Sequence, residues 1–223
     1  MDKSRAEKIL RALQETFELP NWRTYNRDPF RTLIATIISQ NTAERNMEEA
    51  LEKLSLQFQI TPQSLAKAEI GRIEECLKVA GLYRNKAKAI RKVSRIIAEK
   101  FQSDLAPIFS MPLEEARMTL MQLPGVGPKT ADVVLLFCAG RPTIPVDTHV
   151  NRVSKRLDLA PRNGNYEGVR QPLQALYSQN DYLSVHVLLI SLGRNYCTSR
   201  NPSCRECPVE GFCRSKRDFT HHD

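Results

Sequence analysis

The sequence contains no long apolar run. None of its apolar stretches approaches the roughly 20 residues that a membrane-spanning helix requires. Its N-terminus mixes acidic and basic residues and contains no apolar core of the kind found in secretory signals. We therefore expect a soluble, intracellular protein rather than a membrane-spanning or secreted one.

Glycine is also scarce, at 9 of 223 residues, and no segment alternates apolar and polar residues for long enough to indicate a strand. Apolar residues recur instead at helical spacing, with no internal repeat and no low-complexity linker. Few glycines suit a compact helical protein with short connections. We therefore predict an all-α fold. Apolar stripes predict helices over 30–38, 47–58, 73–77, 90–101, 113–121 and 131–138, and further helices are expected near 148–158, 166–178 and 181–193.

Some predicted helix ends carry residues suited to their positions. Asp28 can cap the helix that Pro29 begins, because its side chain can accept hydrogen bonds from the first helical amides. Thr61 and Pro62 offer the same pairing for a later helix. Gly81 is placed to end a helix, since glycine readily adopts the left-handed conformation found there.

Positive charge is in excess. The formal net charge is +8 and the isoelectric point is about 9.3. The basic residues gather in two stretches, seven against one acid between Leu82 and Lys100 and six against two acids between Leu192 and Arg217. Such stretches are commonly solvated faces, but two of them in one chain favour a surface that binds phosphates, with nucleic acid as the leading partner.

The segment LPGVGPKTA, over residues 123–131, is the most informative stretch of the chain. Gly125 and Gly127 permit a tight turn with outward-facing amides, and Pro128 suits the first turn of the helix that follows. The N-terminus of that helix and the turn amides together can hold a phosphate oxygen. The same pattern also occurs as an ordinary connection between two helices.

Two reactive side chains accompany this turn. Lys129 stands at the start of the helix, and Asp147 follows within the segment PVDTH. An amine and a carboxylate can serve as nucleophile and proton acceptor, so the segment can combine phosphate binding with chemistry. His149 and His186 lie among apolar residues of predicted helices, which favours packing or orienting roles over metal ligation.

Four of the six cysteines occur within the last 27 residues, in the spacing Cys197-x6-Cys204-x2-Cys207-x5-Cys213. In a reducing compartment such clustering indicates metal binding rather than disulfides. Four thiolates can hold one tetrahedral zinc ion or a [4Fe–4S] cluster, and one short-spaced pair with two distant partners favours the cluster. A loop held in this way would present its basic residues to phosphates. These residues are Arg200, Arg205, Arg214, Lys216 and Arg217.

These motifs resemble those of the endonuclease III family. That family comprises DNA glycosylases with AP lyase activity in the helix–hairpin–helix–Gly/Pro–Asp superfamily. The resemblance rests on LPGVGPKTA, VDTH and the cysteine spacing, in that order, and extends from Phe30 to Cys213. Two further segments, SQNT over 39–42 and GLYRNKA over 81–87, resemble other loops of the family.

The resemblance implies roles for individual residues. Lys129 would be the nucleophilic amine and Asp147 its catalytic partner, and the four tail cysteines would ligate a [4Fe–4S] cluster. Leu82 matches a loop that the family inserts into DNA when a base is flipped out. The SQNT loop departs from bacterial relatives, so either of its two amide side chains can fill the vacated stack. The expected DNA-binding residues are Gly125, Val126, Gly127, Thr130, Gln40, Asn41, Leu82, Arg84, Lys86, His149 and Arg200.

The resemblance also implies two helical lobes with the active site between them. One would be a six-helix lobe over 22–135, with the helix–hairpin–helix at about 112–139. The other would join 1–21 to 136–223 and carry the iron–sulfur cluster at 197–213.

The implied function is base-excision repair of double-stranded DNA. The protein would remove oxidised or damaged pyrimidines and nick abasic sites by β-elimination through a Schiff base on Lys129. We expect a monomer in the cytoplasm, associated with the nucleoid. Two alternatives stay open: a mismatch-specific thymine or uracil glycosylase of the same superfamily, and a non-catalytic DNA-binding protein with an iron–sulfur cluster.

Overall fold

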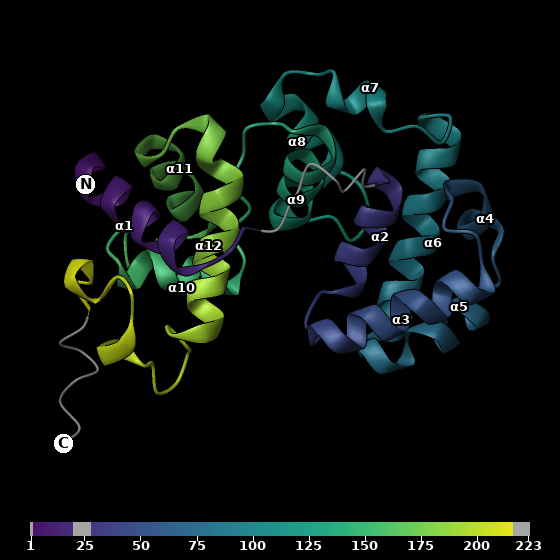
Figure 1. Cartoon of the computed structure of the whole chain (residues 1–223). Coiled ribbons are helices and arrows are strands. Elements are labelled where there is room, and N and C mark those ends of the chain that lie inside the picture. Colours follow the sequence, from purple (N-terminus) through teal and green to yellow (C-terminus); the bar gives the residue numbers. More distant parts are fainter. Residues whose placement is uncertain (1, 20–27, 216–223) are drawn as a thin grey trace. The chain divides into compact units, whose positions relative to one another are not determined.

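The structure is a computed structural model that describes residues 2–19 and 28–215, and every regular element in those ranges is a helix (Figure 1). The all-α prediction is confirmed. No helix in these ranges is long and apolar enough to cross a membrane. The α-helices are α1 (Lys3–Thr16), α2 (Pro29–Ile38), α3 (Glu44–Gln57), α4 (Pro62–Lys67), α5 (Ile70–Leu77), α6 (Tyr83–Lys100), α7 (Ala106–Phe109), α8 (Leu113–Met121), α9 (Pro128–Ala139), α10 (Thr148–Arg156), α11 (Tyr166–Leu176) and α12 (Tyr182–Asn195). Short 3-10 helices are η2 (Lys78–Ala80), η3 (Gln179–Asp181), η4 (Cys204–Glu206) and η5 (Glu210–Phe212).

The chain divides into two compact units. The hairpin unit contains the described residues 28–141, with helices α2 to α9. The cysteine unit contains 2–19 and 142–215, with helices α1, α10, α11 and α12. Each unit has its own apolar core of buried side chains.

Helix α2 lies in the core of the hairpin unit. Asp28 caps it as predicted, and its carboxylate accepts the amides of Phe30 at 2.8 Å and Arg31 at 3.1 Å. Burial of each large aliphatic side chain contributes about 1.5–3 kcal/mol. Helix α2 buries four such side chains completely, so its position is well fixed; they are Leu33, Ile34, Ile37 and Ile38. Figure 1 shows the long helix α6 running past α2, α4 and α5, all of which it contacts.

In the cysteine unit, α12 contacts both α1 and α10. The approach to α10 is close. A Cβ added at Gly193 of α12 would lie 3.0 Å from the Cβ of His149 and 3.2 Å from a methyl group of Val153, both on α10. A glycine at this position therefore lets α10 pack directly against α12, which fixes the helix that follows Asp147.

Three local features differ from the periodic pattern. Met121 was predicted on the buried stripe of α8 but is exposed, because it lies about 100° around the helix from Leu120. Helix α5 begins at Ile70, and η2 continues the chain to Gly81, whose φ of +66° ends the segment. Helix α7 has only four residues, too few for a periodic pattern to reveal.

Candidate functional site

Helices α8 and α9 join through the tight turn that contains Gly125 and Gly127. Gly125 has a φ of +79°, a left-handed conformation that glycine adopts without strain. A Cβ there would also lie 2.9 Å from the Cβ of Ala89 on α6, so the turn approaches α6 too closely for a side chain. Gly127 has a φ of −95° and a ψ of 179°, which is extended backbone open to any residue. The prediction of special backbone angles is confirmed for Gly125 and wrong for Gly127.

The N-terminus of α9 presents backbone amides at this turn. Pro128 occupies the first turn as predicted, and the amides of Lys129 and Thr130 come too early to have a partner within the helix. Such amides, with the helix dipole, can hold a phosphate. The Val126 amide instead donates to the Leu123 carbonyl at 3.1 Å. The side chains of Val126 and Thr130 are buried, which leaves only the backbone atoms of these residues for the predicted DNA contact.

A buried ion pair joins the two helices of the hairpin. Nε of Arg117 on α8 lies 2.8 Å from Oδ1 of Asp132 on α9, and Asp132 is fully buried. Arg117 also lies 3.4 Å from the more exposed Glu114. A buried charge is tolerable only when paired, so the loss of either partner is costly. Sequence analysis missed this pair; the available signal was a charged residue on the core-facing side of each helix.

Lys129 and Asp147 stand at helix starts in different units. Lys129 is the second residue of α9 and is half-buried. Asp147 is the N-cap of α10, where its carboxylate accepts the Val150 amide at 2.7 Å. The helix therefore orients this carboxylate, a structural role that sequence analysis did not assign. His149 is half-buried in the first turn of α10, with Nδ1 3.1 Å from Nη2 of Arg152.

His186 of α12 fixes the chain just before Asp147. It is buried, and its Nδ1 lies 2.8 Å from the carbonyl oxygen of Pro145. This burial and this contact support the predicted packing or orienting role of His186. The contact holds the backbone two residues upstream of the candidate catalytic carboxylate.

Gln40 and Asn41 lie in the loop after α2 and are placed differently. Gln40 is half-buried, and its Nε2 donates to the carbonyl of Gly125 at 2.8 Å. Asn41 is exposed and has a φ of +53°, a left-handed conformation that asparagine tolerates better than most residues. Gln40 is thus bound to the hairpin turn, whereas the side chain of Asn41 faces solvent.

Leu82 lies at the start of α6. It is 58% exposed and has a φ of +48°. A leucine in the left-handed conformation is strained, and strain of this kind clusters at functional positions. Arg84 is exposed nearby, with its guanidinium carbon 5.5 Å from the ring centroid of Tyr83.

Lys86 is buried, whereas it was predicted to contact DNA. The residue is only 4% exposed, and its Nζ donates to the carbonyls of Ile38 at 2.8 Å and Ala80 at 2.9 Å. Burial lowers the pKa of Lys86. An ammonium enclosed by two carbonyls cannot reach a phosphate, so the expectation that Lys86 contacts DNA directly is wrong.

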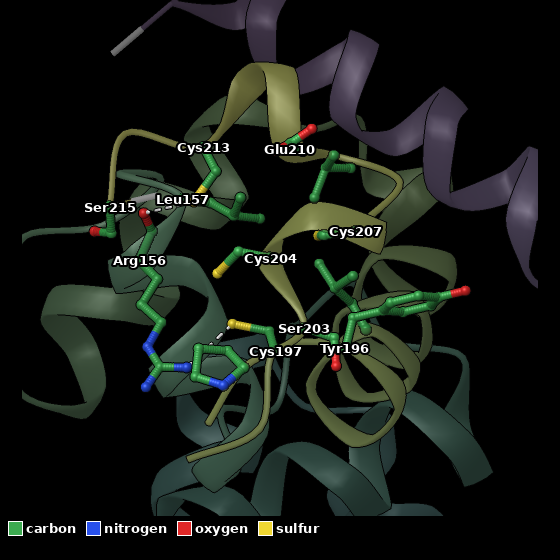
Figure 2. A pocket seen from close by; sticks show the side chains of 13 residues that line it. Arg156, Leu157, Tyr196, Cys197, Ser203, Cys204, Cys207, Glu210, Cys213 and Ser215 are labelled. Atoms are coloured by element: carbon green, nitrogen blue, oxygen red, sulfur yellow. Dashed lines mark hydrogen bonds between the residues drawn. The ribbon is translucent and has the colours of Figure 1, made fainter. Parts of the chain in front are cut away.

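The four tail cysteines line one cavity of the cysteine unit (Figure 2). None of the four forms a disulfide, and all four are half-buried. Burial, and to a smaller degree the neighbouring thiols, raises the pKa of Cys207 to about 11. Within the described residues, no three or more histidine, cysteine or acidic side chains are arranged to hold a metal ion. The structure thus brings the four predicted ligands to one cavity but does not arrange them around a metal ion. Metal coordination stays a prediction.

Arg156 of α10 links that helix to the cysteine loop, residues 197–213. Its Nη1 lies 3.4 Å from Sγ of Cys197 and donates to the Thr198 carbonyl at 2.6 Å. The backbone carbonyl of Arg156 accepts from the Cys213 thiol at 3.6 Å. One arginine thus contacts both ends of the cysteine loop (Figure 2).

Two further arginines hold the same loop, one from α10 and one from α1. Arg152 donates to the Cys197 carbonyl at 2.9 Å, and Arg5 of α1 donates to the Phe212 carbonyl at 3.0 Å. Sequence analysis missed these contacts because the partners are 45 and 207 positions apart. The sequence pattern hardly indicates these contacts, because an arginine on a helix is ordinarily a surface residue.

The basic residues of the tail are only partly described. Arg200 is exposed, in keeping with its expected place on the surface. Arg214 is exposed as well and forms an ion pair with Asp158 at 2.9 Å. Lys216 and Arg217 lie outside the described residues.

Known proteins are similar to this chain in both sequence and fold. The family profile described as HhH-GPD superfamily base excision DNA repair protein matches residues 34–179. Endonuclease III of Thermotoga maritima is 38% identical over 186 residues, which cover 83% of each chain. Endonuclease III of Escherichia coli K12 is 34% identical over 216 residues, 97% of this chain and 98% of its own. A trapped endonuclease III–DNA covalent intermediate has a TM-score of 0.83 and 30% identity, covering 98% of both chains.

Proposed function

The chain belongs to the endonuclease III family, within the HhH-GPD superfamily of base excision DNA repair proteins, and from this premise we propose that it is a bifunctional DNA glycosylase and AP lyase. It removes damaged pyrimidines from double-stranded DNA as a monomer and nicks the strand at abasic sites. One observation carries the proposal: Lys129, a potential nucleophile, stands among the backbone amides that begin α9.

The hairpin turn holds the DNA backbone without reading its sequence. Amides at the start of α9 bind phosphate oxygens, and the positive end of the helix dipole strengthens that contact. Gly125 allows the tight turn and is exposed. Arg84, His149 and Arg200 add further contacts to the DNA, and the excess of positive charge makes binding strongly dependent on salt.

Extrusion of the damaged nucleotide exposes it to chemistry at a cost of a few kcal/mol. Leu82 is an exposed apolar side chain that can wedge into the stack. Asn41 fills the space left by the base, because Gln40 is already bound to the Gly125 carbonyl. The geometry of the free protein thus favours Asn41 over Gln40 for this role.

Lys129 then attacks the sugar C1′ with its neutral amine, and the bond between C1′ and the base breaks. The base leaves with the bonding electrons and takes up a proton, the sugar ring opens, and the lysine nitrogen forms a Schiff base with C1′. Loss of a C2′ proton expels the 3′-phosphate and nicks the strand. The helix N-terminus disfavours the protonated amine. Asp147 accepts the amine's proton or stabilises the cationic sugar.

The four tail cysteines hold a [4Fe–4S] cluster in this proposal. The donor set fits that group, because four cysteines that form no disulfide line one cavity and four thiolates ligate such clusters. Burial raises the pKa of the Cys207 thiol, and a bound cation would stabilise its thiolate. The cluster would cross-link the cysteine loop and take no part in the reaction.

The catalytic role of Asp147 can be separated from its structural role. Asparagine caps helices as well as aspartate does, so Asp147→Asn keeps the α10 cap and removes the charge. We expect single-turnover base release from a duplex with an oxidised pyrimidine to fall by about 10²–10⁴-fold. DNA binding should be retained.

Asp181→Asn is the matched control, because Asp181 stands at the N-cap of α12 and makes no capping bond. This variant should release bases at the wild-type rate. A wild-type protein that binds DNA but neither releases bases nor nicks strands would overturn the proposal in favour of a binding module. Activity confined to thymine or uracil opposite guanine would instead identify a mismatch glycosylase.

A further inference from the structure

Lys86 lies where two loops of the hairpin unit begin. Its Nζ bonds the carbonyl of Ile38, the last residue of α2, and that of Ala80, the last residue of η2. The carbonyls at the C-terminal end of a helix accept no hydrogen bond from within the helix, and they carry partial negative charge. One buried amine therefore satisfies two helix ends at once and sets the distance between them.

The loops that follow these carbonyls carry the candidate filler and wedge. Asn41 comes three residues after Ile38, and Leu82 comes two residues after Ala80. Both residues have a left-handed backbone, with φ of +53° and +48°. Such conformations persist only where the surroundings hold them in place. The bonds of Lys86 supply a restraint at the base of each loop.

Gln40 extends this restraint to a third segment. Its Nε2 bonds the Gly125 carbonyl at 2.8 Å, and Gly125 lies close to Ala89, three residues after Lys86 on α6. The SQNT loop, the Leu82 loop and the hairpin turn are therefore connected through two side chains. Each of the three segments is a short loop between helices.

We propose that Lys86 and Gln40 are positioning residues that hold the filler, the wedge and the phosphate-binding turn in fixed register before DNA arrives. The inference rests on the proposed function. Pre-organised groups pay less conformational entropy on binding, so a fixed register lowers the cost of base extrusion. Removal of the Lys86 amine should therefore slow the step that extrudes the base, while the chemistry on an already extruded base continues.

The test compares one lesion in two contexts, fully paired in a duplex and unpaired within a bubble. Lys86→Met keeps most of the buried stem and removes the amine. We expect its single-turnover base release to fall by about tenfold or more on the paired lesion and much less on the unpaired one, since only the former requires full unpairing. Lys67→Met, at an exposed position of α4 outside the basic stretches, should keep the wild-type ratio of the two rates.

A purely structural role for Lys86 would lower thermal stability and leave the ratio of paired to unpaired rates unchanged, and this result would overturn the proposal. Gln40→Met offers a second variant at a half-buried position, in case Lys86→Met does not fold. It should shift the ratio in the same direction, and an unchanged ratio would again overturn the proposal. A wild-type protein that releases no base in either context would contradict the proposed function instead.

Discussion

The hairpin turn and the cysteine loop are held in place by different means. The hairpin turn lies against the aliphatic core of its own unit, a buried ion pair joins its two flanking helices, and Gln40 donates a hydrogen bond to the carbonyl of Gly125. The cysteine loop contains two short 3-10 helices, and its anchors include arginine bonds to backbone carbonyls. A segment with little apolar burial needs a cross-link to stay ordered. We therefore propose that phosphate binding depends on the fold of the hairpin unit, whereas order in the cysteine loop depends on the proposed cluster.

The largest effect on stability should follow the loss of one partner of the buried ion pair. Asp132→Ala removes the fully buried partner of Arg117 and keeps only the weaker ion pair with the more exposed Glu114, which costs about 3–5 kcal/mol. Urea unfolding of the whole protein measures this loss in the free energy of unfolding. Replacing both residues with leucine should restore most of the stability, because no unpaired charge remains. A single variant as stable as the wild type would show that the ion pair does not hold the hairpin.

A smaller and more local effect should follow loss of the proposed cluster. We expect Cys204→Ser to expose the cysteine loop to trypsin at its arginines, while the hairpin unit resists digestion. Mass spectrometry of the fragments measures which unit is cut first. Cys138→Ser is the matched control, because Cys138 is a half-buried cysteine of the hairpin unit. If trypsin cut both units of Cys204→Ser equally fast, the hairpin turn and the cysteine loop would not be held in place by different means.

Local sequence signals predicted much of the helical framework. Asp28 before Pro29 and Thr61 before Pro62 mark helix starts that the structure contains, because capping depends on residues close in sequence. Gly125 was likewise predictable from its turn. The structural framework around Lys129 and Asp147 was partly predictable, since each stands at a helix start.

Contacts between distant segments were not predictable in this way. Lys86 looks like a surface cation in its basic stretch, and only the fold brings the Ile38 carbonyl, 48 positions away, to its amine. The pairing of Arg117 with Asp132 and the arginine contacts of the cysteine loop depend equally on tertiary packing. Sequence patterns identify which residue types are present, whereas burial decides which of them face a ligand.

The central claim is that Lys129 forms a Schiff base with the sugar of damaged DNA. Borohydride tests it directly, because reduction converts the imine into a stable covalent adduct that migrates as a slower band on a denaturing gel. With a duplex that carries an abasic site, we predict an adduct for the wild type and for Lys100→Gln, and none for Lys129→Gln. Adduct formation by Lys129→Gln at the wild-type level would contradict the account.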